Sequence, residues 1–345
     1  MEQIQARTQR NQTMELFKLL AAVLVVFMHV PFPGELGGLL TCLGSVAVPY
    51  FFMVTGYFNY GAKSKDVERR MVHIICLLVI GRFIYALYDV LVVELNHGST
   101  IAYLRTQLPD LRGVAAWLFN QLRLPPEVGH LWYLNAAILC YGVYWMYIRF
   151  VAEERNRYQG FYLLSLCLFP IFFAKGVVGE GYCDEIRNAW FFGIPFFGAG
   201  LFLHQYQERI VDAYNLNNQK LVAITAIGLV LTVIQWKGQG ENMLPLGMLI
   251  ALFPIFLLLL AHPRISTKSW VEKLSRKCGR MSAWIYIFHM AVRFFYEAFL
   301  CGWVCSKMGT AETFAKPIIV LSITLLWAFI WDCFANLWRR MRMRG

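Results

Sequence analysis

Long apolar segments separated by short polar ones run through almost the whole chain. Most of them approach the roughly 20 residues that a helix needs to cross the hydrocarbon core of a membrane. We predict about ten transmembrane helices, at residues 14–30, 36–60, 72–93, 131–148, 159–174, 188–203, 221–236, 244–261, 281–300 and 317–338. The fold class that follows is an all-α integral membrane protein.

The composition agrees with this pattern. Hydrophobic residues make up 58% of the 345 residues and charged residues only 15%, whereas a soluble domain carries about a quarter charged residues. The net charge of +11 could suggest a nucleic-acid partner, but no basic face stands on a soluble module. We therefore expect the chain to contact the lipid bilayer and to bind no nucleic acid.

The Lys and Arg residues of the loops gather mostly on one side of the predicted membrane. Positive loops stay on the cytoplasmic side during insertion, so we predict that both termini are cytoplasmic. The chain is then a single membrane domain over 1–345, with a cytoplasmic tail at 1–13, a long extracytoplasmic loop at 94–129 and a basic cytoplasmic tail at 339–345. The N-terminus lacks the pattern of a cleavable signal peptide. The expected location is the inner cell membrane.

Two ionisable side chains fall within the first apolar segment. Lys18 and His29 are almost three helical turns apart, so they share one helical face at a separation of about 16 Å along the axis. Lys18 is expected near the cytoplasm and His29 near the outer side. Ionisable groups inside a membrane are usually functional. A Lys that reaches the headgroups and an interfacial His would account for the same pattern.

Other ionisable residues also recur at helical spacing. His289, Arg293 and Glu297 follow at intervals of four residues and share one face, so we expect Arg293 to pair with Glu297. A structural ion pair is the alternative to a catalytic role here. Arg82 and Asp89 share a face of the third predicted helix. Asp332, in the last predicted helix, is near enough to Arg339 for an interfacial pair.

We expect no metal, because the chain has no pair of Cys residues with the usual two-residue spacing of metal ligands. Most of the nine Cys residues lie in apolar segments and are expected to pack as small hydrophobic side chains. A disulfide between Cys301 and Cys305 is open to consideration, but we do not predict one. The acidic loop residues Glu180, Asp184 and Glu185 are expected to be hydrated.

Five motifs resemble, in order, the landmarks of acyltransferase family 3. This family contains membrane acyltransferases that modify cell-surface glycans, peptidoglycan, some lipids and antibiotics. In the first helix Lys18 precedes His29 with ten residues between them, as a basic residue precedes an essential His in the family. The other similar motifs lie at residues 48–58, 129–134, 193–198 and 282–289. The resemblance runs from residue 14 to about 335.

Three features depart from the family pattern. Lys18 stands where most members have Arg, and Lys cannot form the two-pronged contact that Arg makes with a phosphate or carboxylate. Thr55 replaces a Ser, and Arg69 and Arg70 followed by His73 replace two Arg residues spaced three apart. The Lys and the second motif bring the chain nearer to the membrane domains attached to serine racemases of vancomycin-resistance systems, which have been linked to serine uptake.

The resemblance implies an O-acyltransferase that takes an acyl group, most simply acetyl, from cytoplasmic acyl-CoA. His29 would be the general base, since imidazole exchanges protons near neutral pH. Basic residues would hold the phosphates of coenzyme A; these are Lys18, Lys63, Lys65, Arg69 and Arg70. Near the outer side, Glu35 and His130 would orient His29, and Trp132, Tyr133 or Asn135 would stabilise the developing oxyanion. The acceptor would be an extracytoplasmic hydroxyl of a bacterial glycan, peptidoglycan or lipid, and a homodimer is compatible with this layout.

Two other classes of function are alternatives. A transporter of a small solute such as serine would use the same polar stripes as its path, but we find no clear inverted repeat and no paired broken helices, features that many transporters share. A membrane sensor or scaffold would carry the buried charges only as structural pairs. The order of the five motifs favours the acyltransferase.

Overall fold

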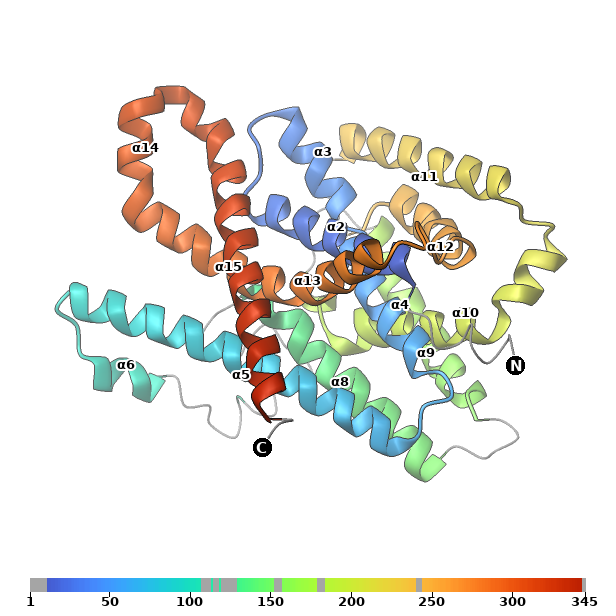
Figure 1. Cartoon of the computed structure of the whole chain (residues 1–345). Coiled ribbons are helices and arrows are strands. Elements are labelled where there is room, and N and C mark those ends of the chain that lie inside the picture. The colour runs from blue at the N-terminus through green and yellow to red at the C-terminus, as the bar shows by residue number, and fades with distance from the viewer. Residues whose placement is uncertain are drawn as a thin grey trace. The chain divides into compact units, whose positions relative to one another are not determined.

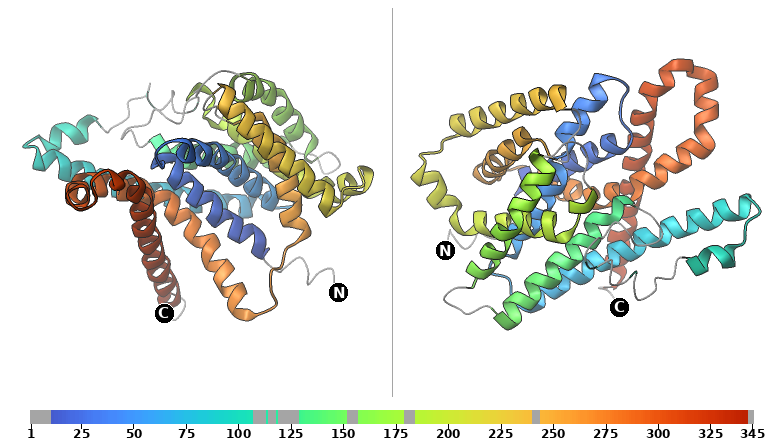
Figure 2. Two further views of the ribbon diagram at one scale, coloured as in Figure 1. Left: turned by 90° about the horizontal axis from the view of Figure 1, so that it is seen from above. Right: turned by 180° about the vertical axis from the view of Figure 1, so that it is seen from behind.

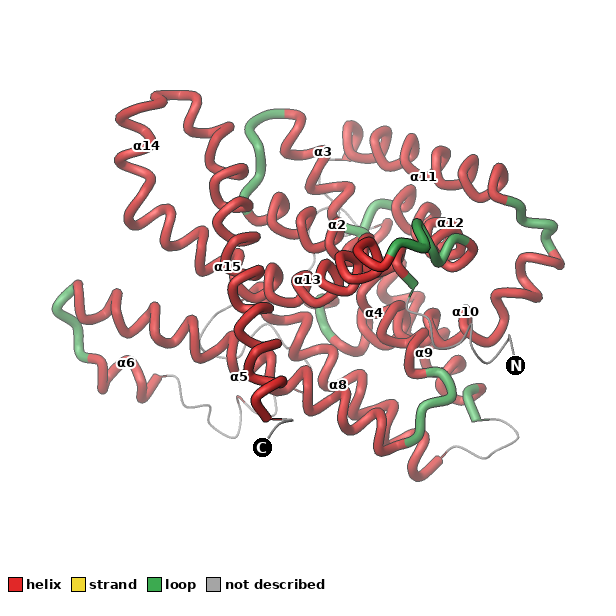
Figure 3. Tube along the Cα trace, viewed as in Figure 1, coloured by secondary structure: helices red, strands yellow, loops and turns green. Residues whose placement is uncertain are grey.

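The structure is a computed structural model, and it describes residues 11–106, 113, 118, 129–151, 157–178, 184–239 and 244–342. These residues form helices joined by turns, with no strand among them (Figure 3). The predicted all-α class is therefore confirmed. Most of the predicted loop at 94–129, and both extreme ends of the chain, lie outside the described residues.

Within the described residues, six helical spans are long and apolar enough to cross a membrane. They are Gln12–His29, Glu35–Asn59, Ser64–Leu95, Gly129–Val151, Asn218–Gly238 and Ser269–Leu337. Shorter apolar helical segments occur at Gln159–Lys175 and Leu246–Ala261. Each of the ten predicted segments overlaps a helix of the structure. The number of ten crossings and the cytoplasmic location of both termini stay predictions.

The outward face of one long helix, α5 (Ser64–Leu95), is apolar. Val72, Val79, Phe83 and Leu87 are each more than half exposed, and their spacing of four or seven residues places them along one side of the helix. A soluble protein rarely leaves such a stripe in contact with water. The hydrocarbon of a bilayer removes that cost, so the chain is a multi-pass membrane protein.

The described chain packs into two compact units. Unit 1 comprises residues 1–47, 216–241 and 246–345, and unit 2 comprises residues 48–215 and 242–245. Each unit has its own buried apolar core. That the whole chain acts as one domain stays a prediction.

Unit 1 combines helices from both ends of the chain. Its helices are α2 (Gln12–His29), α3 (Glu35–Gly44), α11 (Asn218–Gln239), α12 (Leu246–Ala261), α13 (Ser269–Phe295), η6 (Tyr296–Leu300), α14 (Cys301–Met308), η7 (Gly309–Ala311) and α15 (Glu312–Arg342). Figure 1 and the right panel of Figure 2 show the chain turning back near α14. The single apolar span at 269–337 therefore holds two long helices, α13 and α15.

The helices α2 and α13 lie side by side and run in the same direction. Glu15, near the start of α2, lies beside Gly279 of α13. His29, at the end of α2, lies beside His289, ten residues further along α13. Each pair joins segments that are more than 250 residues apart in the sequence, so only folding brings them together.

The helices α13 and α15 are also neighbours, but they run in opposite directions. Arg280 in the first half of α13 pairs with Asp332 in the second half of α15. Tyr296, just after α13, bonds to Glu312 at the start of α15. Unit 1 therefore has one group of polar residues around the start of α2 and another around its end.

Unit 2 holds the middle of the chain. It takes in α4 (Ala47–Asn59) from its second residue, followed by α5, α6 (Thr100–Thr106), η1 (Gly129–Leu131), α8 (Trp132–Met146), η2 (Tyr147–Val151), α9 (Gln159–Phe172), η3 (Phe173–Val178), η4 (Asp184–Ile186), η5 (Ala189–Gly193) and α10 (Ile194–Ala213). Helix α5 packs along α8, and α9 packs along α10.

Two of the five sequence motifs meet where α4 crosses α10. A Cβ atom on Gly56 would lie 1.9 Å from the carbonyl oxygen of Phe197, and one on Gly200 would lie 2.0 Å from that of Met53. No side chain fits at these positions, so the two backbones touch directly. Small residues allow this close packing in membranes, where van der Waals contact holds helices together. Gly56 of the motif at 48–58, and Gly200 just after the motif at 193–198, thus have a structural reason to be glycine.

Candidate active site

Helix α2 carries both Lys18 and His29, and it is held at its two ends. At its start, the side-chain oxygen of the buried Gln12 accepts a hydrogen bond from the backbone N–H of Ile265 at 2.9 Å. At its end, Nη1 of Arg293 donates to the carbonyl oxygen of His29 at 2.9 Å. A cation at this position satisfies a carbonyl that has no partner within the helix and complements the helix dipole.

The ring of His29 packs against the ring of His289 on α13. The two ring centroids are 5.0 Å apart, with an angle of 37° between the planes. His289 is fully buried, and its Nδ1 lies 2.8 Å from the carbonyl oxygen of Tyr286. A carbonyl oxygen can only accept, so Nδ1 of His289 carries a hydrogen and its ring orientation is fixed. The sequence predicted His289 as part of a polar stripe but did not predict its contact with His29.

The predicted ion pair between Arg293 and Glu297 is confirmed. Nε of Arg293 lies 3.0 Å from Oε1 of Glu297, and Nζ of Lys316 on α15 lies 2.8 Å from the same oxygen. All three side chains are about one-third exposed, so the stability gained is small, as for most surface pairs. The ion pair instead orients the Arg293 side chain. It holds the guanidinium where Nη1 reaches the carbonyl oxygen of His29.

The other predicted residue of α2, Lys18, lies 3.4 Å from Glu15. Both side chains are largely shielded, with exposed fractions of 18% for Lys18 and 12% for Glu15. The carboxylate fits there because the facing residue of α13 is Gly279, where a Cβ would lie 1.4 Å from Oε2 of Glu15. The absence of a side chain at Gly279 therefore leaves room for the Glu15 carboxylate beside Lys18.

Replacement of Gly279 by Ala is expected to displace Glu15 and weaken its pair with Lys18. Extra atoms in a packed interior cost about 1–3 kcal/mol, and we expect a loss of this size in the free energy of unfolding, measured in detergent. Gly142→Ala is the matched control, because no atom lies within 4 Å of its added methyl group. Glu15→Ala should restore the stability of the Gly279→Ala variant. If Gly279→Ala lowers the free energy of unfolding no more than Gly142→Ala does, the contact between Gly279 and Glu15 is not tight.

A second ion pair joins α13 to α15 at the same half of α13 as Gly279. Nε and Nη2 of Arg280 lie 2.7 and 3.0 Å from the two carboxylate oxygens of Asp332. Asp332 is buried, and Asn336 donates a further hydrogen bond to it at 3.0 Å. The sequence predicted Arg339 as the partner of Asp332, but the side chain of Arg339 lies outside the described part of the chain. Arg280 was missed because its distance in sequence gives no signal of contact.

In unit 2, the predicted phosphate-binding residues differ in their surroundings. Lys63, Lys65 and Arg69 are exposed, and Arg69 lies 3.5 Å from Asp66 at the surface. Arg70 instead holds the end of α4, which is described next. The structure therefore leaves three of these four cations open to solvent.

The turn after α4 is held by side chains from several segments. Nη1 of Arg70 donates to the carbonyl oxygen of Phe58 at 2.6 Å and to Oδ1 of Asn59 at 2.9 Å. Arg157, from beyond α8, donates to the carbonyl oxygen of Ala62 at 2.9 Å, and the Tyr144 hydroxyl donates to that of Asn59 at 3.0 Å. Basic side chains at the carboxyl end of a helix satisfy its last carbonyls. The sequence pattern assigned no individual role to Arg157.

His130 and Trp132, which the sequence placed near the outer side, are both buried in unit 2. The ring of His130 meets the ring of Tyr85 edge to face at 4.9 Å between centroids. Trp132 packs against Phe192 at 5.5 Å, and the guanidinium of Arg187 lies 5.2 Å from the Trp132 ring. Trp132 is thus fixed by aromatic and cation–π contacts, each typically worth about 0.5–1.5 kcal/mol.

The remaining acidic residues of the prediction lie mostly in exposed positions. Glu35 lies 3.8 Å from Lys237, and their side chains are 83% and 59% exposed. Glu185 lies 3.2 Å from Lys175 and is also exposed, as expected for a hydrated loop charge. Glu180 lies outside the described residues. The predicted role of Glu35 in orienting His29 stays a prediction.

Arg82 and Asp89 lie on α5 in unit 2, and both are partly buried. Asp89 accepts a hydrogen bond from the hydroxyl of Tyr103 on α6 at 2.6 Å. Burial, and then the bond to Asp89, raise the pKa of the Tyr103 phenol above its ordinary value. The phenol therefore stays protonated and continues to donate, which ties α6 to α5.

The family model for the acyltransferase domain of acyltransferase family 3 matches residues 11–334, nearly the whole chain. The protein belongs to this family and is a membrane acyltransferase. Neither the curated proteins nor the solved structures give a match to the chain. The helix α2 with Lys18 and His29, and both motifs at the crossing of α4 and α10, fall within the matched region.

Proposed function

We propose that this acyltransferase uses His29 as the general base in the transfer of an acyl group from acyl-CoA to a hydroxyl. The observation that carries the proposal is the fixed position of His29. Its carbonyl oxygen binds Arg293, and its ring packs against the buried ring of His289. A general base must stay within hydrogen-bond reach of the proton that it takes. A residue held at its backbone by Arg293 and at its ring by His289 meets this need.

The proposed reaction converts a thioester into an ester. As the acceptor oxygen attacks the acyl carbon, its proton passes to the imidazole of His29. The bond between carbon and sulfur then breaks, and the proton from His29 passes to the sulfur of coenzyme A. A donor must stabilise the negative oxygen that forms in between, and Trp132, Tyr133 and Asn135 are our candidates for it.

For the donor we propose acetyl-CoA or another acyl-CoA from the cytoplasm. We assign its phosphates to Lys18, Lys63, Lys65 and Arg69, which are basic residues on the predicted cytoplasmic side. The exposure of the last three supports this assignment. Arg70 is engaged at the end of α4, so we assign it first to that turn and second to the phosphates.

For the acceptor we propose a hydroxyl group of a glycan, peptidoglycan or lipid on the outer side of a bacterial inner membrane. The product would be an O-acylated, most simply O-acetylated, envelope component. Membership of an acyltransferase family supports the reaction class. The predicted position of His29 near the outer end of its helix supports an extracytoplasmic acceptor.

Binding of acetyl-CoA to the detergent-purified protein tests the donor. We expect Lys18→Ala to weaken binding by about 10- to 100-fold, the effect of losing one hydrogen bond to a charged group of 1.5–3 kcal/mol. His29→Ala should bind acetyl-CoA as the parent protein does, because the base contacts the acceptor. Lys273→Ala, an exposed Lys on α13, is the control for loss of net charge.

Glu15→Gln separates binding by Lys18 from a structural role. The change removes the carboxylate beside Lys18 but leaves the ammonium group in place. If Lys18 holds a phosphate, Glu15→Gln binds acetyl-CoA at least as well as the parent protein. If Lys18 acts only through its ion pair with Glu15, Lys18→Ala and Glu15→Gln weaken the binding of acetyl-CoA equally. No binding of acetyl-CoA or longer acyl-CoAs to the folded parent protein would overturn the donor assignment.

A further inference from the structure

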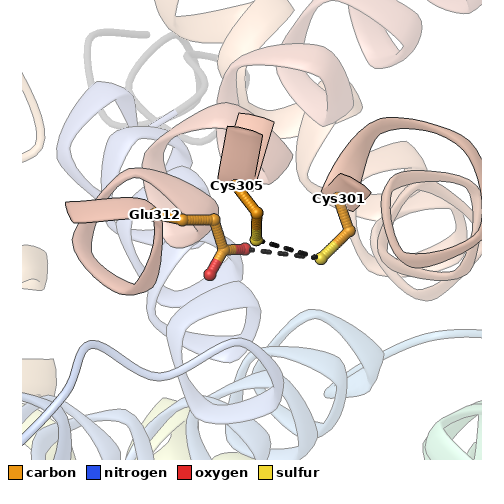
Figure 4. Close-up of side chains that lie close together, drawn as sticks. All are labelled: Cys301, Cys305 and Glu312. Atoms are coloured by element: carbon orange, nitrogen blue, oxygen red, sulfur yellow. Dashed lines mark hydrogen bonds between the residues drawn. The ribbon is translucent and has the colours of Figure 1, made fainter. Parts of the chain in front are cut away.

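A cluster of two thiols and one carboxylate, which includes neither His29 nor Lys18, lies at the turn between α13 and α15. Sγ of Cys301 lies 3.8 Å from Sγ of Cys305, and 3.9 Å from Oε1 of Glu312 (Figure 4). The ligand atoms of all three residues lie within 4.8 Å of one another. The two thiols come from α14 and the carboxylate from the first residue of α15, so the cluster bridges two helices.

The separation of the two sulfur atoms fits a tetrahedral zinc ion. Zinc binds thiolate sulfur at about 2.3 Å, and two such bonds at the tetrahedral angle place the sulfur atoms about 3.8 Å apart. The observed separation between Cys301 and Cys305 is 3.8 Å. Thiolates favour zinc or copper(I), and a carboxylate as the third ligand favours zinc. Sequence spacing alone did not indicate this site, because the two thiols are one helical turn apart and the carboxylate follows in a separate helix.

A disulfide fits the same residues less well. Residues four apart on a helix have Cβ atoms about 5–6 Å apart, whereas a disulfide needs about 3.5–4.5 Å. Cys301 and Cys305 both lie within the continuous helix α14. A disulfide would therefore distort this helix, whereas a metal ion leaves it intact.

Glu312 is oriented for this role. Its side chain is buried, and Oε1 accepts a hydrogen bond from the hydroxyl of Tyr296 at 2.8 Å. Tyr296 is itself fully buried, so the carboxylate cannot turn freely. Among the described residues, no Lys or Arg forms an ion pair with Glu312, and a buried carboxylate is costly without a cation. Hydrogen bonds of this kind orient metal ligands in known sites.

We propose that Cys301, Cys305 and Glu312 bind one zinc ion that ties α14 to the start of α15. Binding releases the protons of the two thiols, because the thiolate is the ligand form. Cys305 is exposed, so the fourth position of the ion faces solvent and takes a water molecule. The site does not depend on the proposed acyl transfer.

Zinc content of the full chain in detergent tests the proposal. The protein is reduced, incubated with zinc sulfate, desalted and analysed for metal. We expect one zinc ion per chain in the parent protein and in Cys167→Ser, which removes another exposed Cys, and loss of zinc from Cys301→Ser with Cys305→Ser. Cobalt substituted for zinc should show a charge-transfer band from sulfur in the parent protein and in Cys167→Ser, but not in the double variant.

Two single changes keep the test decisive if the double variant does not fold. Tyr296→Phe keeps the ring but frees the carboxylate, and it should lower zinc affinity by about 10- to 100-fold. Glu312→Gln should lower it as well, because an amide is a poorer ligand. The proposal is overturned if the parent protein retains no more zinc than the double variant. It is also overturned if the unreduced protein holds a disulfide between Cys301 and Cys305 and the reduced protein binds no zinc.

Discussion

Replacement of His29 by Ala is expected to lower the rate of acyl transfer by about 10²–10⁴-fold, the usual contribution of a general base. The variant should fold, because the contact of Arg293 with residue 29 is made to the backbone carbonyl, which Ala retains. The measurement is the transfer of labelled acetyl groups from acetyl-CoA to envelope material in membranes. Thermal unfolding in detergent should change little.

His262→Ala is the control for this experiment, since His262 is an exposed residue of the same unit. It should transfer acetyl groups as the parent protein does. Unchanged transfer by His29→Ala would remove His29 from the mechanism, even with a folded protein that binds acetyl-CoA. Loss of transfer together with loss of folding would instead point to a structural role for His29 beside His289.

Replacement of Arg280 by Ala is expected to lower the free energy of unfolding by about 3–5 kcal/mol. The change leaves the Asp332 carboxylate, which is only 1% exposed, without its cation, and an unpaired buried charge has a cost of this size. The measurement is unfolding in detergent with increasing denaturant. A second change, Asp332→Asn, should recover part of the loss because no buried charge then remains.

Arg276→Ala provides the matched control on the same helix. Arg276 lies 3.0 Å from Glu272, but both side chains are more than one-third exposed. An exposed pair at this spacing contributes about 0.3–0.5 kcal/mol, so we expect a change no larger than that. Equal costs for Arg276→Ala and Arg280→Ala would show that burial of Asp332 does not decide the stability of this contact.

Patterns within one segment were sufficient to predict several features. Apolar runs located a helix at each of the ten predicted segments, since burial in lipid demands length and low charge. Spacing of four residues predicted the ion pair between Arg293 and Glu297, because such residues are neighbours on any helix. The separation of Lys18 and His29 along α2 follows from helix geometry in the same way.

Contacts between distant segments were not predictable by these means. In a soluble protein, hydrophobic periodicity tells which face of a helix turns inward. In a membrane this periodicity is a weak signal, because lipid is as apolar as a protein core. The partners of His29, Glu15 and Asp332 on neighbouring helices therefore left no mark in the sequence pattern. The role of Arg70 at the end of α4 was not predictable for a related reason. An Arg beside a predicted cytoplasmic loop is expected whether it binds a phosphate or the end of a helix.

By itself, the sequence determined that this protein is an all-helical membrane protein of an acyltransferase family, and it placed Lys18 and His29 on one helix. These properties depend on composition, on length and on the order of short motifs along the chain. Only the tertiary structure decided that His289 packs against His29, that Gly279 leaves room for Glu15 beside Lys18, and that two thiols meet the carboxylate at the start of α15. Each of these contacts depends on how helices rotate and pack against their neighbours, which a local pattern does not specify.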